Sequence, residues 1–215
     1  ACLRKETFGD MDVTYWLEEE SGSVGLELTP AGMRAQRQKK NQRVDSLVQI
    51  RLRGDDFPFG FANGHTMRGS GSLPRFRVDQ QRLEPGAERS AIVTTLASED
   101  GLVIEHCLTH DCAERGLEIR TVFENRGESS VTLEMLSSFS LSGITPFAAG
   151  DAPGSLALHR LRSKWSNEGR LDSQTIEDLQ LEPSWSGHGA SSEKFGQVGS
   201  MPVRRFFPFC AQMAR

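Results

Sequence analysis

The chain has 215 residues, of which 37% are hydrophobic and 25% are charged, and its formal net charge is -4. This composition is typical of a globular protein and lacks the cationic excess of nucleic-acid-binding proteins, so we expect no nucleic-acid partner. No apolar run approaches the roughly 20 residues that a membrane helix needs, so we also expect no membrane partner.

Two segments alternate apolar and polar residues in the way that is typical of a strand with one buried face. In Leu47–Arg53, every second residue from Val48 to Leu52 is apolar. In Leu117–Glu124, the residues Leu117, Ile119, Thr121 and Phe123 share one face, and Asn125-Arg126-Gly127 supplies a turn signal. Period-two alternation of this kind predicts strands with one wet face.

Further strands are predicted in chain order at Val13–Leu17, Val24–Thr29, Ala91–Leu96, Leu102–Leu108, Val131–Leu136, Phe139–Ser142 and Leu156–Leu161. Amphipathic helical stretches are scarce. Many short strands with turn residues between them favour a sandwich or barrel over alternating strands and helices. The sequence therefore predicts an all-β protein, a large antiparallel β-sandwich that spans residues 1–215 as a single domain.

An apolar run near the end of the chain, Arg205–Cys210, contains three phenylalanines. Such a run is normally covered by other parts of a protein. The chain also lacks an initial methionine. We therefore expect residues 1–215 to be an incomplete N-terminal fragment of a larger enzyme.

The four cysteines stand at positions 2, 107, 112 and 210, which is too sparse for a disulfide scaffold. We predict free thiols, which favours the cytoplasm, although no segment decides the compartment. His106, Cys107, His110 and Cys112 have metal-binding side chains, but a strand would place His106 and Cys107 on opposite faces. No second ligand pair with suitable spacing occurs, so we predict no metal site.

No catalytic motif is found in the sequence. Acidic pairs such as Asp55-Asp56 and Glu99-Asp100 lie at predicted turns, where solvated carboxylates are expected. The chain has no Gly-x-Ser-x-Gly elbow and no glycine-rich phosphate loop. We predict no catalytic residue and no cofactor.

The segment Leu156–Leu171 combines cationic, aromatic and amide side chains on what begins as a strand. A saccharide offers hydroxyls to hydrogen-bond and an apolar face that an indole can cover. The candidate residues for substrate binding or subunit contact are His159, Arg160, Arg162, Trp165, Asn167, Glu168 and Trp185. Two alternatives remain open. These residues could be solvated on a loop, or the two tryptophans could be core residues. A buried Trp165 would not contact a substrate or a subunit.

Three stretches, Gly116–Asn125, Val131–Phe139 and Leu158–Arg170, together resemble the N-terminal region of α-galactosidase-type glycoside hydrolases, the melibiase and raffinose-hydrolysing family. The order and spacing of the stretches are also similar. The chain departs from the family's pattern at one place. Members of the family commonly have an acidic residue, a serine and an arginine leading to a Gly-Thr-Ser-His stretch, whereas this chain has Ser184–His188.

The resemblance implies a β-supersandwich similar to galactose mutarotase, which in the family precedes a catalytic (β/α)8 barrel. The two catalytic aspartates of that family lie in the barrel, which this chain lacks. The family's N-terminal domain helps to assemble oligomers and lends residues to the edge of the sugar pocket. By this resemblance, Trp165 and the loop around Trp185 are the counterparts, the partner is a galactoside, and the protein is a homo-oligomer.

Two other functions remain open from the sequence. The first is a stand-alone carbohydrate-binding module in which tryptophans form a stacking platform. The second is a mutarotase-like sugar epimerase, which needs a histidine and a carboxylate for proton transfer. For the epimerase, His106, His110 and His159 are the strand-associated candidates.

Overall fold

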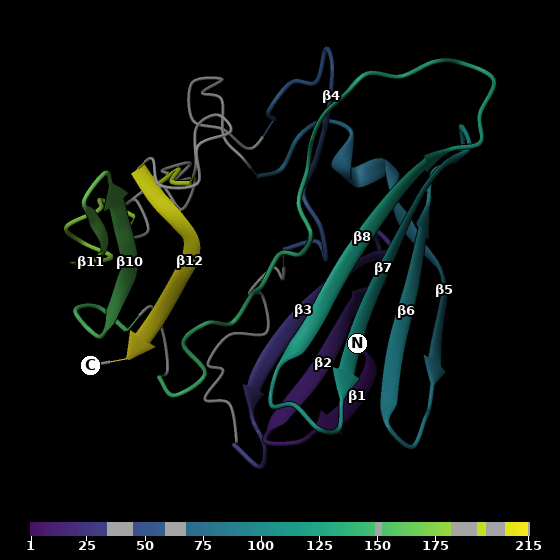
Figure 1. The fold of residues 1–215 in the computed structure, drawn as a ribbon. Helices are drawn as coiled ribbons and strands as arrows, with labels where there is room; N and C mark the ends of the chain where they lie inside the picture. Colours follow the sequence, from purple (N-terminus) through teal and green to yellow (C-terminus); the bar gives the residue numbers. More distant parts are fainter. Residues whose placement is uncertain (34–44, 59–67, 149–151, 182–192, 197–204, 215) are drawn as a thin grey trace.

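A computed structural model describes residues 1–33, 45–58, 68–148, 152–181, 193–196 and 205–214. Within these ranges the chain forms strands, one short 3-10 helix at Leu73–Arg75 and no α-helix (Figure 1). The strands are β1 (Cys2–Phe8), β2 (Met11–Glu18), β3 (Ser23–Pro30), β4 (Ile50–Leu52), β5 (Arg77–Glu84), β6 (Arg89–Ala97), β7 (Leu102–Asp111), β8 (Leu117–Asn125), β9 (Leu133–Leu136), β10 (Leu156–Lys164), β11 (Asn167–Thr175) and β12 (Arg205–Ala214).

Two antiparallel layers face each other. One layer has the strand order β1-β2-β3, and the other has the order β5-β6-β7-β8. The first layer continues past β3 towards the β4-β9 pair, because Leu47 N–H donates to the Val24 carbonyl and Ser142 N–H donates to the Leu26 carbonyl. The predicted all-β antiparallel sandwich is confirmed.

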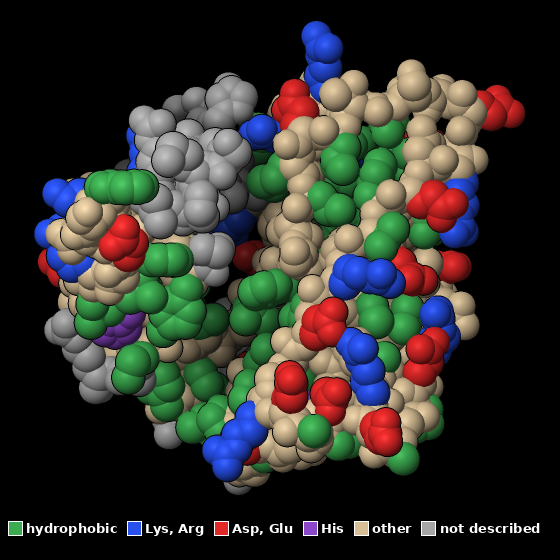
Figure 2. Space-filling view, in the orientation of Figure 1, with side chains coloured by type: hydrophobic (Ala, Val, Ile, Leu, Met, Phe, Trp, Pro, Cys, Tyr) green, Lys and Arg blue, Asp and Glu red, His purple; other side chains and the backbone are tan. Residues whose placement is uncertain are grey.

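The core lies between these layers in two clusters. The first joins β2 and β3 to β6 and β7 through the buried residues Val13, Tyr15, Val24, Leu26, Leu47, Ile92 and Leu108. The second joins β4 and the residues just before it to β6 and β7. Its buried members are Val48, Ile50, Leu52, Phe76, Leu96, Leu102 and Ile104. The outward faces of β5–β8 carry charges of both signs (Figure 2), including the Arg89–Glu118 and Arg126–Glu124 ion pairs. Burial alternates along β8, whereas consecutive residues of β2 and β3 are buried, so both faces of these two strands are largely covered.

A third antiparallel sheet, with the order β11-β10-β12, stands beside the β3 edge of the sandwich (Figure 1). Leu156 of β10 and Gln212 of β12 line one pocket with Leu28 and Pro30 of β3. Hydrophobic side chains are visible over this sheet in Figure 2, and Leu171, Phe209 and Met213 are exposed there. The apolar run near the end of the chain thus forms part of a strand with exposed side chains.

Several strands differ from the sequence-based prediction. Four were not predicted at all: β1, β5, β11 and β12. Phe139–Ser142 was predicted as a strand but forms an isolated bridge, in which Leu141 pairs with Leu26. Gln49 was predicted on a wet face, yet it is buried, and its amide is hydrogen-bonded there: Gly69 N–H donates to its Oε1, and its Nε2 donates to Ser140 Oγ.

Candidate functional site

The β10–β11 hairpin carries most of the candidate residues, and it ends in a two-residue turn. Lys164 pairs with Asn167 in the ladder, so Trp165 and Ser166 form the tip. Ser166 adopts a left-handed conformation with φ 60°, and its N–H donates to the Glu168 carboxylate at 3.0 Å. The Trp165 side chain is 79% exposed at this tip. An indole so exposed contributes little to a core, so the alternative that Trp165 is a core residue is wrong, and its contact role stays a prediction.

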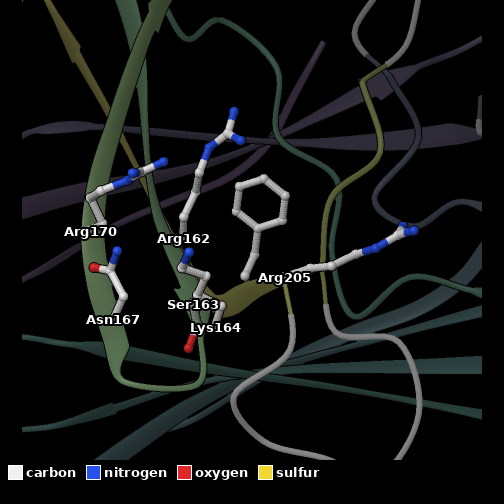
Figure 3. Close-up of a pocket in the computed structure, with 7 residues that line it drawn as sticks. Arg162, Ser163, Lys164, Asn167, Arg170 and Arg205 are labelled. Atoms are coloured by element: carbon white, nitrogen blue, oxygen red, sulfur yellow. The ribbon is translucent and has the colours of Figure 1, made fainter.

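A pocket of about 430 Å³ lies next to this tip, between the hairpin and the start of β12 (Figure 3). Its lining residues are Arg162, Ser163, Lys164, Asn167, Arg170, Arg205 and Phe206. The volume lies within the range of small-molecule sites in proteins. Among the described residues, the lining combines cations, an amide, a hydroxyl and one aromatic ring, without a carboxylate.

Arg160 lies behind the pocket and is 2% exposed. Its guanidinium donates to Asp172 at 2.9 Å and to Glu193 at 2.6 Å, and it also binds Gln174. The rings of Phe195 and Phe206 each have their centroid 5.2 Å from its Cζ. Arg160 is therefore bound on several sides within the sheet, and its role here is to fix the position of Phe206 at the pocket.

Asp172 connects Arg160 to the exposed Arg162. Its Oδ2 accepts hydrogen bonds from Arg160 at 2.9 Å and from Arg162 at 3.2 Å. Partial burial alone would raise the pKa of Asp172, but the bonds from Arg162 and Arg160 outweigh it and hold this pKa below its ordinary value. Arg162 also lies over the Phe206 ring, 5.5 Å from its centroid. This network orders the wall of the pocket.

The structure brings some predicted site residues together and separates others. Arg162 and Asn167 line the pocket, and Trp165 and Glu168 lie at or next to the tip of the same hairpin. Arg160 is buried behind it. Trp185 lies outside the described residues.

The remaining candidate of the hairpin, His159, lies on the other face of the third sheet. Its Nδ1 is 2.8 Å from the hydroxyl of Ser173, its partner on β11. His159 and Arg160 are adjacent on one strand, so their side chains point to opposite faces. His159 therefore does not contribute to the pocket wall.

Five pocket residues were missed by the sequence-based prediction: Ser163, Lys164, Arg170, Arg205 and Phe206. The turn alone does not indicate Arg170: a two-residue turn at Trp165-Ser166 would pair Arg162 with Gly169, and a register shift between Arg162 and Lys164 places Arg170 opposite Arg162 instead. Arg205 and Phe206 reach the pocket because β12 pairs with β10, and no local pattern indicates that pairing.

The other strand histidines lie in the sandwich. His106 is fully buried on β7, and neither ring nitrogen has a hydrogen-bond partner among the described residues. Burial lowers the pKa of His106 to about 4. His110 stacks on Phe8, with 5.3 Å between ring centroids. Neither histidine lies at the hairpin pocket.

The described residues contain no cluster of three or more histidine, cysteine, aspartate or glutamate side chains suited to a metal ion. All four cysteines are free, as the sequence predicts. Within the described ranges, no helix has the length and apolar character needed to span a bilayer. Comparison with protein-family models, curated proteins and solved structures finds no match for this chain.

Proposed function

We propose that this chain is the non-catalytic β-sandwich region of a carbohydrate-active enzyme that resembles the α-galactosidases. In this proposal, the β10–β11 hairpin contacts a galactoside at the edge of the sugar pocket. The proposal is carried by Trp165, whose side chain is 79% exposed at the tip of an ordered hairpin. An exposed indole can cover the apolar face of a sugar ring.

The pocket beside the tip supplies the polar groups that a sugar requires. The Asn167 amide and the Arg162 guanidinium both line it and offer hydrogen-bond donors to ring hydroxyls. Arg162 is held in place by Asp172 at 3.2 Å. A donor that is already ordered loses less entropy when a ligand binds, which favours recognition at this site.

The test of this proposal is calorimetric titration of the purified protein with methyl α-galactoside. We expect Trp165→Ala to weaken binding roughly tenfold or more, as loss of a central aromatic contact commonly does, and Trp165→Phe to weaken it less. Phe139→Ala is the matched control, because Phe139 is an exposed aromatic residue that does not line the pocket. Equal binding by Trp165→Ala and the unaltered protein would contradict the proposal.

The same chain should not hydrolyse nitrophenyl α-galactoside, because the proposal places the catalytic aspartates in a separate barrel. Turnover by residues 1–215 alone would overturn this part of the proposal. A carbohydrate-binding module is the second candidate, since Trp165 and the pocket beside it all belong to the third sheet. Tight binding by the 215-residue chain without a barrel favours the module.

An epimerase is not part of the proposal. That reaction requires a histidine and a carboxylate at the sugar, whereas His106 is buried in the core and His110 is stacked on Phe8. His159 instead contacts a serine hydroxyl.

We further propose that the protein is a homo-oligomer that uses the apolar face of the third sheet. Leu171 and Met213 are exposed there, and the ladder places their partners Leu161 and Ala157 on the same side of β10. Exposed apolar side chains gathered on one sheet face are typical of contact surfaces. Sedimentation should show an oligomer that Met213→Glu dissociates, and a monomeric unaltered protein would contradict this.

A further inference from the structure

The charge of the hairpin pocket is not what a neutral sugar requires. Four of its lining side chains are cationic: Arg162, Lys164, Arg170 and Arg205. Arg162 has one carboxylate partner, Asp172, which it shares with the buried Arg160. Within the described part of the chain, no carboxylate lies within ion-pair distance of the other three. The described lining of the pocket therefore holds a surplus of positive charge.

Two of these cations are placed directly against each other. Arg162 on β10 and Arg170 on β11 are partners in the antiparallel register, and their side chains extend in similar directions in Figure 3. Like charges at directly opposed positions destabilise a pair of strands. An anion bound between the two guanidiniums would remove this repulsion, and the planar fork of each arginine suits carboxylate, sulfate or phosphate oxygens.

The remaining lining is suited to the rest of a sugar. Asn167 offers an amide, Phe206 offers a ring face, and the exposed Trp165 lies at the adjoining tip. A bare anion would use none of these three groups. From the combined charge and this lining, we infer that the pocket binds an acidic sugar, a saccharide whose ring carries a carboxylate, sulfate or phosphate. This inference rests on the proposed sugar-binding function and specifies its ligand class.

The experiment compares four ligands that share one ring. Galactose, galacturonate, galactose 6-sulfate and galactose 6-phosphate are titrated into the purified protein by calorimetry at low ionic strength. At least one acidic sugar should bind about tenfold more tightly than galactose, since each charge-assisted hydrogen bond is worth about that factor. The difference should shrink as salt is added, because exposed charges are screened. The tightest of the three acidic ligands identifies the anionic group.

Two variants connect the binding to the pocket. Arg170→Gln should weaken binding of the acidic sugar about tenfold and leave binding of galactose nearly unchanged. Lys164→Gln should weaken it as well, because Lys164 is another cation that lines the pocket. Arg126→Gln is the control, because Arg126 is an exposed arginine that follows β8 and does not line the pocket.

The possible outcomes separate the acidic-sugar inference from the proposed function. If galactose binds as tightly as every acidic sugar, the acidic ligand class is overturned and the proposed function stands. If no sugar binds, both are overturned. If inorganic sulfate binds as tightly as galactose 6-sulfate, and Trp165→Ala changes neither, the site takes a bare anion and the inferred sugar is overturned.

Discussion

The guanidinium of Arg160 on β10 is buried against the carboxylate of Asp172 on β11, with 2.9 Å between Nη2 and Oδ2. The two residues are also partners in the ladder. This relationship holds together the face of the third sheet that carries the pocket, because Phe206 lies against the same guanidinium.

Arg160→Ala should therefore destabilise the third sheet by about 3 kcal/mol, because it removes the buried guanidinium that Asp172 and Glu193 share and leaves Asp172 only its longer bond to Arg162. Urea unfolding measures the change in the global free energy of unfolding, and hydrogen exchange at the β10 amides measures the change in local opening of the third sheet. Arg162→Ala is the matched control, since it removes a half-exposed partner of the same Asp172 and should cost less than about 1 kcal/mol. Equal losses for the two variants would show that burial does not strengthen the Arg160 interaction.

His106 should make stability depend on pH. Burial lowers its pKa from 6.5 to about 4, so below pH 6.5 the unfolded chain takes up a proton that the folded chain does not. The stability is therefore fully present above pH 6.5 and falls as the pH drops towards 4, by about 3 kcal/mol in all. Urea unfolding at a series of pH values measures this slope.

His106→Leu should remove that contribution to the slope. At pH 7 the variant should be at least as stable as the unaltered protein, because neither buried ring nitrogen has a hydrogen-bond partner among the described residues. An unchanged slope in the variant would mean that other groups cause the pH dependence.

Two glycines with positive φ should respond differently to alanine. A Cβ at Gly101 (φ +85°) would lie 2.8 Å from the backbone nitrogen of Gly127, whereas a Cβ at Gly54 (φ +93°) meets nothing within 4 Å. Gly54→Ala should cost about 1 kcal/mol for its backbone conformation, and Gly101→Ala about 3 kcal/mol because the backbone must also shift. Equal costs in urea unfolding would contradict the close approach at Gly101.

The exposure of Trp165 can be tested without a ligand. Trp165→Phe should reduce the fraction of tryptophan emission that iodide quenches, since the Trp165 side chain is 79% exposed and Trp16 is partly covered and donates to Glu27 at 2.8 Å. The free energy of unfolding should change by less than about 0.5 kcal/mol. An unchanged quenchable fraction would place the Trp165 indole within the fold.

Alternating side chains made much of the sandwich predictable. From Val48 to Leu52 and from Leu117 to Phe123, the residues that the alternation assigns to the inner face are the more buried ones in the structure. β5 and β11 were missed because their sequences, Arg77–Glu84 and Asn167–Thr175, are largely polar. Their strand conformation comes from hydrogen bonding to the neighbouring strand rather than from an apolar pattern.

The sequence by itself determined the all-β class, the inner faces of its clearest strands, and the presence of cationic, amide and aromatic side chains around Trp165. Only the tertiary structure decided which of these side chains share a pocket. Arg160 and Arg162 are alike in sequence and both lie against Phe206, yet the first is buried and also packs on Phe195, whereas the second is half-exposed. The physical reason is that β12 pairs with β10 from more than 40 residues away, and such pairing leaves no local pattern in the chain.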